Sequence, residues 1–215
     1  MRRAPRVLIL DFDGVVIESN AVKTEAFRRV FSRFPEQAEA MMAFHQAHVS
    51  LSRFDKFEHL LGLMGRADDA VLQADIAADF SRRVLEGLAA VPLVPGAETF
   101  LREMTLRLPV YLASVTPAEE LTGILAKRGL AHWFRDVYGC PPWTKPAAIR
   151  DVFAREGVRP GDALLIGDSA GDQRVAQMTG IDFLARDSGL SFDAPAPLIF
   201  ADLNEIYDYL VESRS

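Results

Sequence analysis

The chain has 215 residues, of which 49% are hydrophobic and 25% charged, and its formal net charge is −6. These values predict a soluble globule with a sizeable core, and the negative charge argues against a nucleic-acid or acidic-membrane partner, because such partners need basic patches. The lone cysteine, Cys140, excludes an internal disulfide and a cysteine-based metal cluster, and fits a reducing cytoplasm. The apolar run after Met-Arg-Arg is short and ends at Asp11, so we reject a signal peptide, and no apolar stretch is long enough to span a bilayer.

The first predicted element is a strand over residues 7–10, because Val-Leu-Ile-Leu is typical of a strand buried on both faces. Asp11 and Asp13 follow at its carboxyl end, and then Gly14. Buried acids are costly unless a partner offsets their charge, and the usual offset is a hard cation held by oxygen ligands. The alternative is a strand end followed by an ordinary Asx-type turn.

A long region without an obvious strand comes next. The spacing of its apolar residues predicts helices over 20–34, 36–49, 53–63 and 68–88. The segment 91–96, with two prolines and a glycine, then breaks the pattern and is a candidate linker or hinge.

Strands and helices alternate after this segment. Strands are predicted at 109–114, 136–139, 163–166, 181–185 and 198–200, and helices at 97–107, 117–128, 146–156, 172–178 and 203–211. Such alternation predicts a parallel sheet with helices on both faces, which binds ligands at the carboxyl ends of its strands. The predicted class is therefore α/β: a Rossmann-like core of residues 1–18 and 91–215, with an inserted α-helical cap of residues 19–90 over that edge.

Polar residues follow four of the predicted strand ends. They are Asp11 and Asp13, then Ser114 and Thr116, then Lys145 in a loop, and finally Asp168, Ser169 and Asp172. Each signal is weak alone, since lysines are usually solvated, serines at strand ends often cap helices, and Gly-Asp-Ser often forms a turn. Converging carboxylates would repel one another, and Mg²⁺ would offset that repulsion. With a lysine and a hydroxyl as further donors, such a site favours a phosphate.

In this order the four segments resemble the four motifs of the haloacid dehalogenase-like (HAD) superfamily, beginning with Asp-Phe-Asp-Gly-Val-Val-Ile-Glu-Ser from Asp11 and ending at Asp172. The likeness is to the subfamily with a helical cap after the first motif, which includes phosphoglycolate phosphatases and β-phosphoglucomutases. It implies a Mg²⁺-dependent phosphatase that acts on a small phosphorylated metabolite such as a sugar, polyol or hydroxy-acid phosphate. We expect a monomer or small homo-oligomer in the cytoplasm.

The resemblance also assigns catalytic roles. Asp11 would be the nucleophile that forms an aspartyl-phosphate, and Asp13 would protonate the leaving oxygen and then activate water. Ser114 would donate a hydrogen bond to the phosphoryl oxygens. Lys145 would neutralise phosphoryl charge and position Asp11.

A metal site follows from the same resemblance. Asp11 and the backbone carbonyl of Asp13 would bind Mg²⁺ together with Asp168. Asp172 would be a further ligand or would support one.

Asp13 discriminates between the reactions known in the superfamily. Its dehalogenases lack an acid at this position and use no metal, and its phosphonatases have a small apolar residue there. Sugar phosphomutases keep the acid but typically have a histidine where Lys23 stands here. A phosphatase is therefore the primary hypothesis, with a phosphomutase and a non-catalytic binding module on the same scaffold as alternatives.

The cap region holds candidate specificity residues. Arg53 and Lys56, three residues apart, could face a second anionic part of the substrate or belong to a solvated helix face. Thr116 is a further candidate substrate contact. His45 and His48 have a spacing that suits metal ligands, but because no third ligand is evident we interpret them as partly buried histidines.

Overall fold

The chain forms two compact units in the computed structural model, which describes residues 4–88, 90–195 and 197–212. The core unit contains the residues up to Glu18 and those from Pro92 onward, and the helical unit is Ser19–Val91. The expected division into two separate domains, with a boundary near residue 90, stays a prediction. No helix among the described residues combines the length and apolarity needed to cross a membrane.

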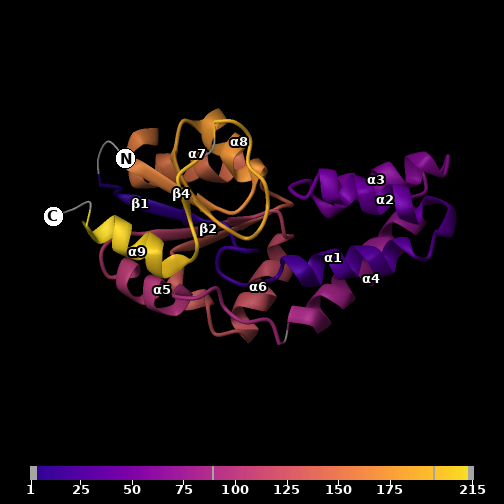
Figure 1. The fold of residues 1–215 in the computed structure, drawn as a ribbon, viewed down its shortest axis with the longest axis horizontal. Helices are drawn as coiled ribbons and strands as arrows, with labels where there is room; N and C mark the ends of the chain where they lie inside the picture. Colours follow the sequence, from indigo (N-terminus) through magenta and orange to yellow (C-terminus); the bar gives the residue numbers. More distant parts are fainter. Residues whose placement is uncertain (1–3, 89, 196, 213–215) are drawn as a thin grey trace. The chain divides into compact units, whose positions relative to one another are not determined.

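The core unit is built on a six-stranded parallel sheet with the strand order β3-β2-β1-β4-β5-β6 (Figure 1). The strands are β1 (Val7–Leu10), β2 (Val110–Ser114), β3 (Asp136–Gly139), β4 (Ala163–Gly167), β5 (Asp182–Arg186) and β6 (Ile199–Phe200). This sheet confirms the predicted α/β class.

Helices cover both faces of the sheet. They are α5 (Ala97–Thr105), α6 (Ala118–Lys127), α7 (Lys145–Glu156), α8 (Ala170–Thr179) and α9 (Leu203–Glu212), with short 3₁₀ turns η1 (Ala131–Trp133) and η2 (Pro160–Asp162). Figure 1 shows α7 and α8 on one face and α5 and α9 on the other. Burial from both sides explains why the central strands are continuous apolar runs.

Strand β1 lies at the centre of this core, and all four of its residues are fully buried. Val7 and Ile9 pack in one cluster with Ile149 and Val152 of α7. Leu8 and Leu10 alternate with them and face the opposite side of the sheet. Each such side chain stabilises the fold by roughly 1.5–3 kcal/mol, so the end of β1 is held firmly in place.

The register of the sheet brings the predicted site segments together. Leu10 pairs with Leu112 of β2 and with Ile166 of β4. The strands on the two sides of β1 are reached by crossovers in opposite directions, which makes its carboxyl end a topological switch point. Residues that follow β1, β2 and β4 therefore meet at one edge.

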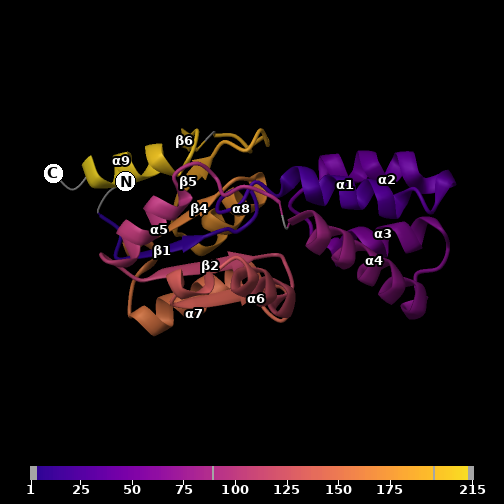
Figure 2. The same ribbon diagram turned by 90° about the horizontal axis from the view of Figure 1, so that it is seen from below.

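The described residues of the helical unit form four helices, α1 (Asn20–Phe31), α2 (Pro35–Ala47), α3 (Arg53–Leu63) and α4 (Ala70–Leu88). Both α1 and α3 pack against α2 and α4 (Figure 2). The rings of Phe27, Phe57 and Phe80 meet in the interior, with the Phe27 and Phe80 centroids 4.3 Å apart.

Helix α1 ends earlier than the spacing predicts, at Phe31 rather than at Phe34. The reason is Pro35, because the residue before a proline disfavours the helical conformation. Phe34 accordingly adopts φ −126° and ψ 73°, and Pro35 begins α2 at a position where its missing N–H is harmless.

Candidate active site

Asp11 is the first residue after β1, and its surroundings fix it closely. Its backbone N–H donates to the carbonyl of Ile166 at 2.9 Å, which continues the sheet ladder by one residue. Its Oδ1 accepts from the N–H of Phe12 at 2.7 Å, and its Oδ2 lies 3.0 Å from Nζ of Lys145. The residue is only 6% exposed. A carboxylate is thus presented at the carboxyl edge of the sheet in a defined orientation.

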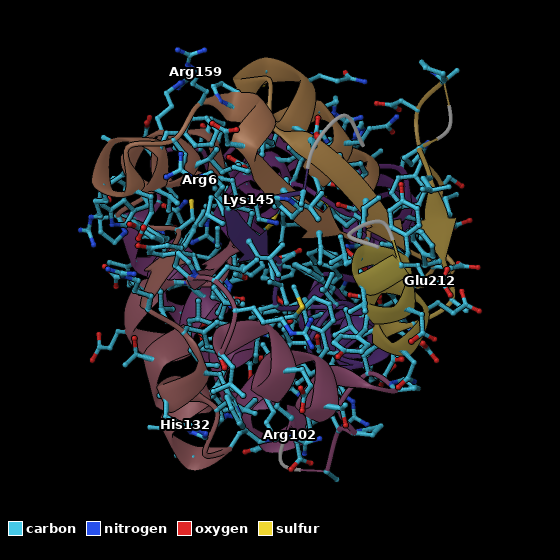
Figure 3. The ribbon with its side chains drawn as sticks, turned by 90° about the vertical axis from the view of Figure 1, so that its left-hand side faces the viewer. Arg6, Arg102, His132, Lys145, Arg159 and Glu212 are labelled. Carbon is cyan, nitrogen blue, oxygen red and sulfur yellow. The ribbon has the colours of Figure 1, made fainter. Side chains whose placement is uncertain are left out.

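The structure places Lys145 at the start of a helix, which corrects the predicted loop. Lys145 is the first residue of α7, and the hydroxyl of Thr144 accepts from the N–H of Ala147 as the helix N-cap. Pro146 is favoured in this first turn, so a capping threonine followed by proline was a helix-start signal. Figure 3 shows Lys145 inside the core unit beside β1, whereas the labelled Arg102 and Arg159 extend outward. Nζ of Lys145 pairs with the carboxylates of Asp11 and Asp172.

Asp172 lies in the first turn of α8, which begins two residues before the predicted start. The hydroxyl of Ser169 caps this helix: it accepts from the N–H of Asp172 and donates to Oδ2 of Asp172 at 2.6 Å. Gly167 permits the close approach, because a Cβ there would lie 2.3 Å from Cβ of Asp172. Asp168, between them in sequence, is 3% exposed.

Three buried carboxylates meet at this edge. One oxygen from each of Asp11, Asp168 and Asp172 lies within 4.8 Å of the others. Burial raises the pKa of the Asp11 carboxyl well above its usual range; Lys145 opposes this shift, and the neighbouring acids reinforce it. Burial alone would lower the pKa of Lys145, but the carboxylates of Asp11 and Asp172 outweigh it and raise that pKa.

This group of residues fits a divalent cation. The donors are carboxylate oxygens, which hard cations prefer, and they converge closely enough to share one ion. One lysine alone does not balance the three carboxylates. A cation held among them would favour the ionised form of Asp11 that burial disfavours.

Asp13 is held by two hydroxyl groups from the segment that follows β2. Its Oδ2 accepts from Oγ of Ser114 at 3.3 Å and from Oγ1 of Thr116 at 3.2 Å. Oγ of Ser114 also accepts from the N–H of Thr116 at 3.1 Å. Asp13, Ser114 and Thr116 are 7%, 2% and 2% exposed, so these bonds lie away from bulk water. The structure therefore brings the residues of all four motifs to one edge.

The two candidate specificity residues of the helical unit are buried, so the interpretation of a solvated helix face is wrong. Arg53 is 6% exposed; its Nη1 donates to Oγ of Ser81 at 2.7 Å, and its guanidinium carbon lies 4.6 Å from the centroid of the Phe80 ring. Lys56 is 1% exposed, and its Nζ donates to the carbonyl of Val49 at 3.1 Å.

The two candidate histidines have different environments. His45 is 4% exposed, with Nδ1 at 3.1 Å from Nζ of Lys56 and Nε2 at 3.2 Å from Oγ1 of Thr24. His48 is exposed. His45 is therefore buried, as expected, whereas the expectation of partial burial is wrong for His48.

Sequence reasoning missed Arg186, the last residue of β5. Its guanidinium donates to the carbonyl of Gly14 at 3.2 Å and to both carboxylate oxygens of Glu18, and its Nε donates to the carbonyl of Ala201. Arg186 is 7% exposed. The available signal was an arginine at the end of a predicted strand of the same sheet, together with a glutamate in the first motif.

A parallel sheet with buried carboxylates and one lysine at its carboxyl ends defines an α/β protein with an acidic, cation-fitting site. Residues 5–179 match the sequence model of the haloacid dehalogenase-like hydrolases, so the chain belongs to this hydrolase family. The resemblance noted from the four motifs is thereby confirmed.

Known relatives cover nearly the whole chain. It is 26% identical to the phosphoglycolate phosphatase of Rhodospirillum rubrum, over 96% of this chain and 91% of that protein, and 26% identical to phosphoglycolate phosphatase 1 of Pseudomonas aeruginosa, over 93% and 77%. Among solved structures, a predicted phosphatase from Clostridium acetobutylicum has a TM-score of 0.78 at 19% identity, covering 98% of this chain and all of that one. YfnB from Bacillus subtilis, bound to magnesium, has a TM-score of 0.71 at 21% identity and covers 97% and 99%.

Proposed function

We propose that this protein is a phosphatase that hydrolyses a small phosphorylated metabolite through a phosphoryl group transferred to Asp11. The observation that carries the proposal is the position of Asp11: a buried carboxylate at a strand end, paired with Lys145 and beside two further acids. Membership of a hydrolase family and the likeness to curated phosphoglycolate phosphatases support the same reaction.

The chemistry proceeds in two displacements. A carboxylate oxygen of Asp11 forms a bond to phosphorus while the bond from phosphorus to the leaving oxygen breaks, and Asp13 gives its proton to that oxygen. Water then attacks phosphorus, the bond to Asp11 breaks, and Asp13 takes up the proton of the water. Lys145 offsets negative charge beside Asp11 throughout. The hydroxyl of Ser114, which donates to Asp13 here, would turn its proton to a phosphoryl oxygen when the substrate is bound.

Mg²⁺ is the cation that we assign to the acidic cluster. Asp11, Asp168 and the backbone carbonyl of Asp13 would hold it, with Asp172 as a further ligand or as the group that orients Lys145. When bound, it would neutralise charge on the phosphoryl oxygens. The carboxylate cluster supports this assignment, as does the magnesium bound to the structurally similar YfnB.

The helical unit would act as the cap that selects the substrate, with Arg53 and Lys56 as positive charges beneath its surface that favour an anionic group. Phosphoglycolate is the first substrate to test, because the curated relatives are named for it. The proposal includes a cytoplasmic location, which the single cysteine supports, and a monomer or small homo-oligomer.

The test is Asp11→Asn, assayed by phosphate release from phosphoglycolate and from 4-nitrophenyl phosphate with Mg²⁺ present. We expect kcat to fall by at least roughly a thousandfold, because the amide cannot accept phosphorus, with unchanged circular dichroism. Asp208→Asn is the matched control, since Asp208 is exposed on α9. Wild-type turnover by Asp11→Asn would overturn the proposal. Sugar monophosphates in the same panel separate phosphate release from migration of phosphate within the sugar.

A further inference from the structure

The contacts of Asp13 point to a residue whose role in the reaction goes beyond the four motif positions. Thr116 lies two residues after β2 and is 2% exposed. Its hydroxyl lies 3.2 Å from Oδ2 of Asp13, which is closer than the 3.3 Å of the Ser114 hydroxyl. The substrate contact that the sequence suggested for Thr116 stays a prediction, and in this structure its hydroxyl bonds to Asp13.

The backbone of Thr116 is anchored at both of its peptide groups. Its N–H donates to Oγ of Ser114 at 3.1 Å, and its carbonyl accepts from the N–H of Cys140 at 2.9 Å, next to the end of β3. Oγ of Ser114 thus links the backbone of Thr116 to the carboxyl group of Asp13. The segment from Ser114 to Thr116 therefore forms a rigid support for one carboxyl group.

Both hydroxyl groups bond to the same carboxylate oxygen, Oδ2 of Asp13. A carboxyl group with one oxygen that accepts two hydrogen bonds cannot turn freely about its Cβ–Cγ bond. Fixing Oδ2 also fixes the plane of the carboxyl group, and proton transfer depends strongly on such orientation.

We propose that Thr116 is a positioning residue for Asp13: its hydroxyl anchors Oδ2 and so holds the carboxyl group in the orientation that delivers the proton to the leaving oxygen. This inference rests on the proposed function. The contribution of Thr116 to the rate should therefore increase with the basicity of the leaving oxygen. An aryl oxyanion of low basicity leaves without one, whereas an alkoxide does not.

The experiment compares Thr116→Val with the wild type on a series of aryl phosphates from 2,4-dinitrophenyl to phenyl phosphate, and on glycerol 2-phosphate. We expect kcat/KM on glycerol 2-phosphate to fall at least about tenfold, with less than about a threefold loss on 2,4-dinitrophenyl phosphate. This ratio reports the transfer to Asp11, in which general acid catalysis contributes most for poor leaving groups, whereas kcat also contains the water attack common to all substrates. Thr116→Ser restores the hydroxyl and should recover most of the lost activity. A purely structural defect would lower the rates on all substrates alike.

Two further variants keep the test decisive. Thr122→Val is the matched control, because the exposed hydroxyl of Thr122 bonds to the carbonyl of Ala118 on α6, and it should match the wild type. If Thr116→Val does not fold, Thr116→Ala takes its place. Asp13→Asn should show the same leaving-group dependence more strongly. If it does and the Thr116 variants do not, the positioning role is overturned while the proposed function stands; if Asp13→Asn shows none, the acid role of Asp13 is itself refuted.

Discussion

Two buried lysines show how neighbouring residues decide the pKa of a side chain. Lys145 is 9% exposed beside two carboxylates, which raise its pKa. Lys56 is 1% exposed, and among the described residues no carboxylate oxygen lies within 4.0 Å of its Nζ. Burial therefore lowers its pKa to about 7, with the charge of Lys23 acting in the same direction and Asp55 opposing. His45, next to Lys56, has its pKa lowered to about 4 by burial and by the charges of Lys56 and Arg28.

A pH dependence of stability follows from Lys56. Between pH 7 and 10.5 the unfolded chain binds this proton and the folded chain does not, so the free energy of unfolding of the helical unit should rise with pH across that window. Lys56→Met should abolish the rise, which is on the order of a few kcal/mol. Urea unfolding followed by ellipticity measures it, while the fluorescence of Trp133 and Trp143 reports the core unit separately. Lys127→Met, at an exposed position on α6, is the control, and an unaltered slope in Lys56→Met would refute the assignment.

At the scale of elements, the loop after β1 depends on a contact from β5, two strands away in the same sheet. Residues 12–18 fold back on themselves through the bonds from the N–H of Gly14 to the carbonyl of Ile17 and from the N–H of Val16 to that of Phe12, and Gly14 adopts φ 73°. Arg186 at the end of β5 ties this loop down through Gly14 and Glu18. Because the loop carries Asp13, β5 contributes to the site without contributing a catalytic group.

Arg186→Met should therefore lower both stability and activity. Glu18 is 33% exposed and regains water, so we expect a loss of about 1–3 kcal/mol, together with a fall in kcat of roughly tenfold as the loop loosens. Arg186→Lys keeps the charge but loses the two-pronged geometry and should be intermediate. Chemical denaturation and phosphate release are the measurements. Arg174→Met removes a pair with Asp193 that is half exposed on both sides, and a similar loss there would contradict the role of Arg186.

At the scale of the molecule, the two units differ in what a metal does for them. The acidic cluster belongs entirely to the core unit. A cation that binds only the native state would therefore stabilise the core unit against unfolding. We expect saturating Mg²⁺ to raise the thermal midpoint reported by Trp133 and Trp143 by about 5 °C or more. EDTA should reverse the shift and abolish phosphate release. Asp168→Asn should show little shift, and a full shift in that variant would remove Asp168 from the metal site.

Much of the fold was predictable because it depends on local pattern. The buried run of β1 and the alternation after Pro92 predicted the parallel sheet, and the order of the four motifs predicted which strand ends would meet. The predicted loop at Lys145 was wrong because the capping role of Thr144 was overlooked. The burial of Arg53 and Lys56 was not predictable, because helical spacing alone does not tell a cation that packs against phenylalanine rings from one in water.

The sequence by itself determined the class of fold, the family and the identity of the acids and the lysine at the strand ends, since apolar periodicity and motif spacing are properties of neighbouring residues. The tertiary structure alone decided which oxygen of Asp13 the hydroxyls of Ser114 and Thr116 hold, and that Arg186 restrains the loop after β1. Those contacts join residues about 100 and 170 positions apart, and their geometry depends on strand register and side-chain packing that no local pattern encodes.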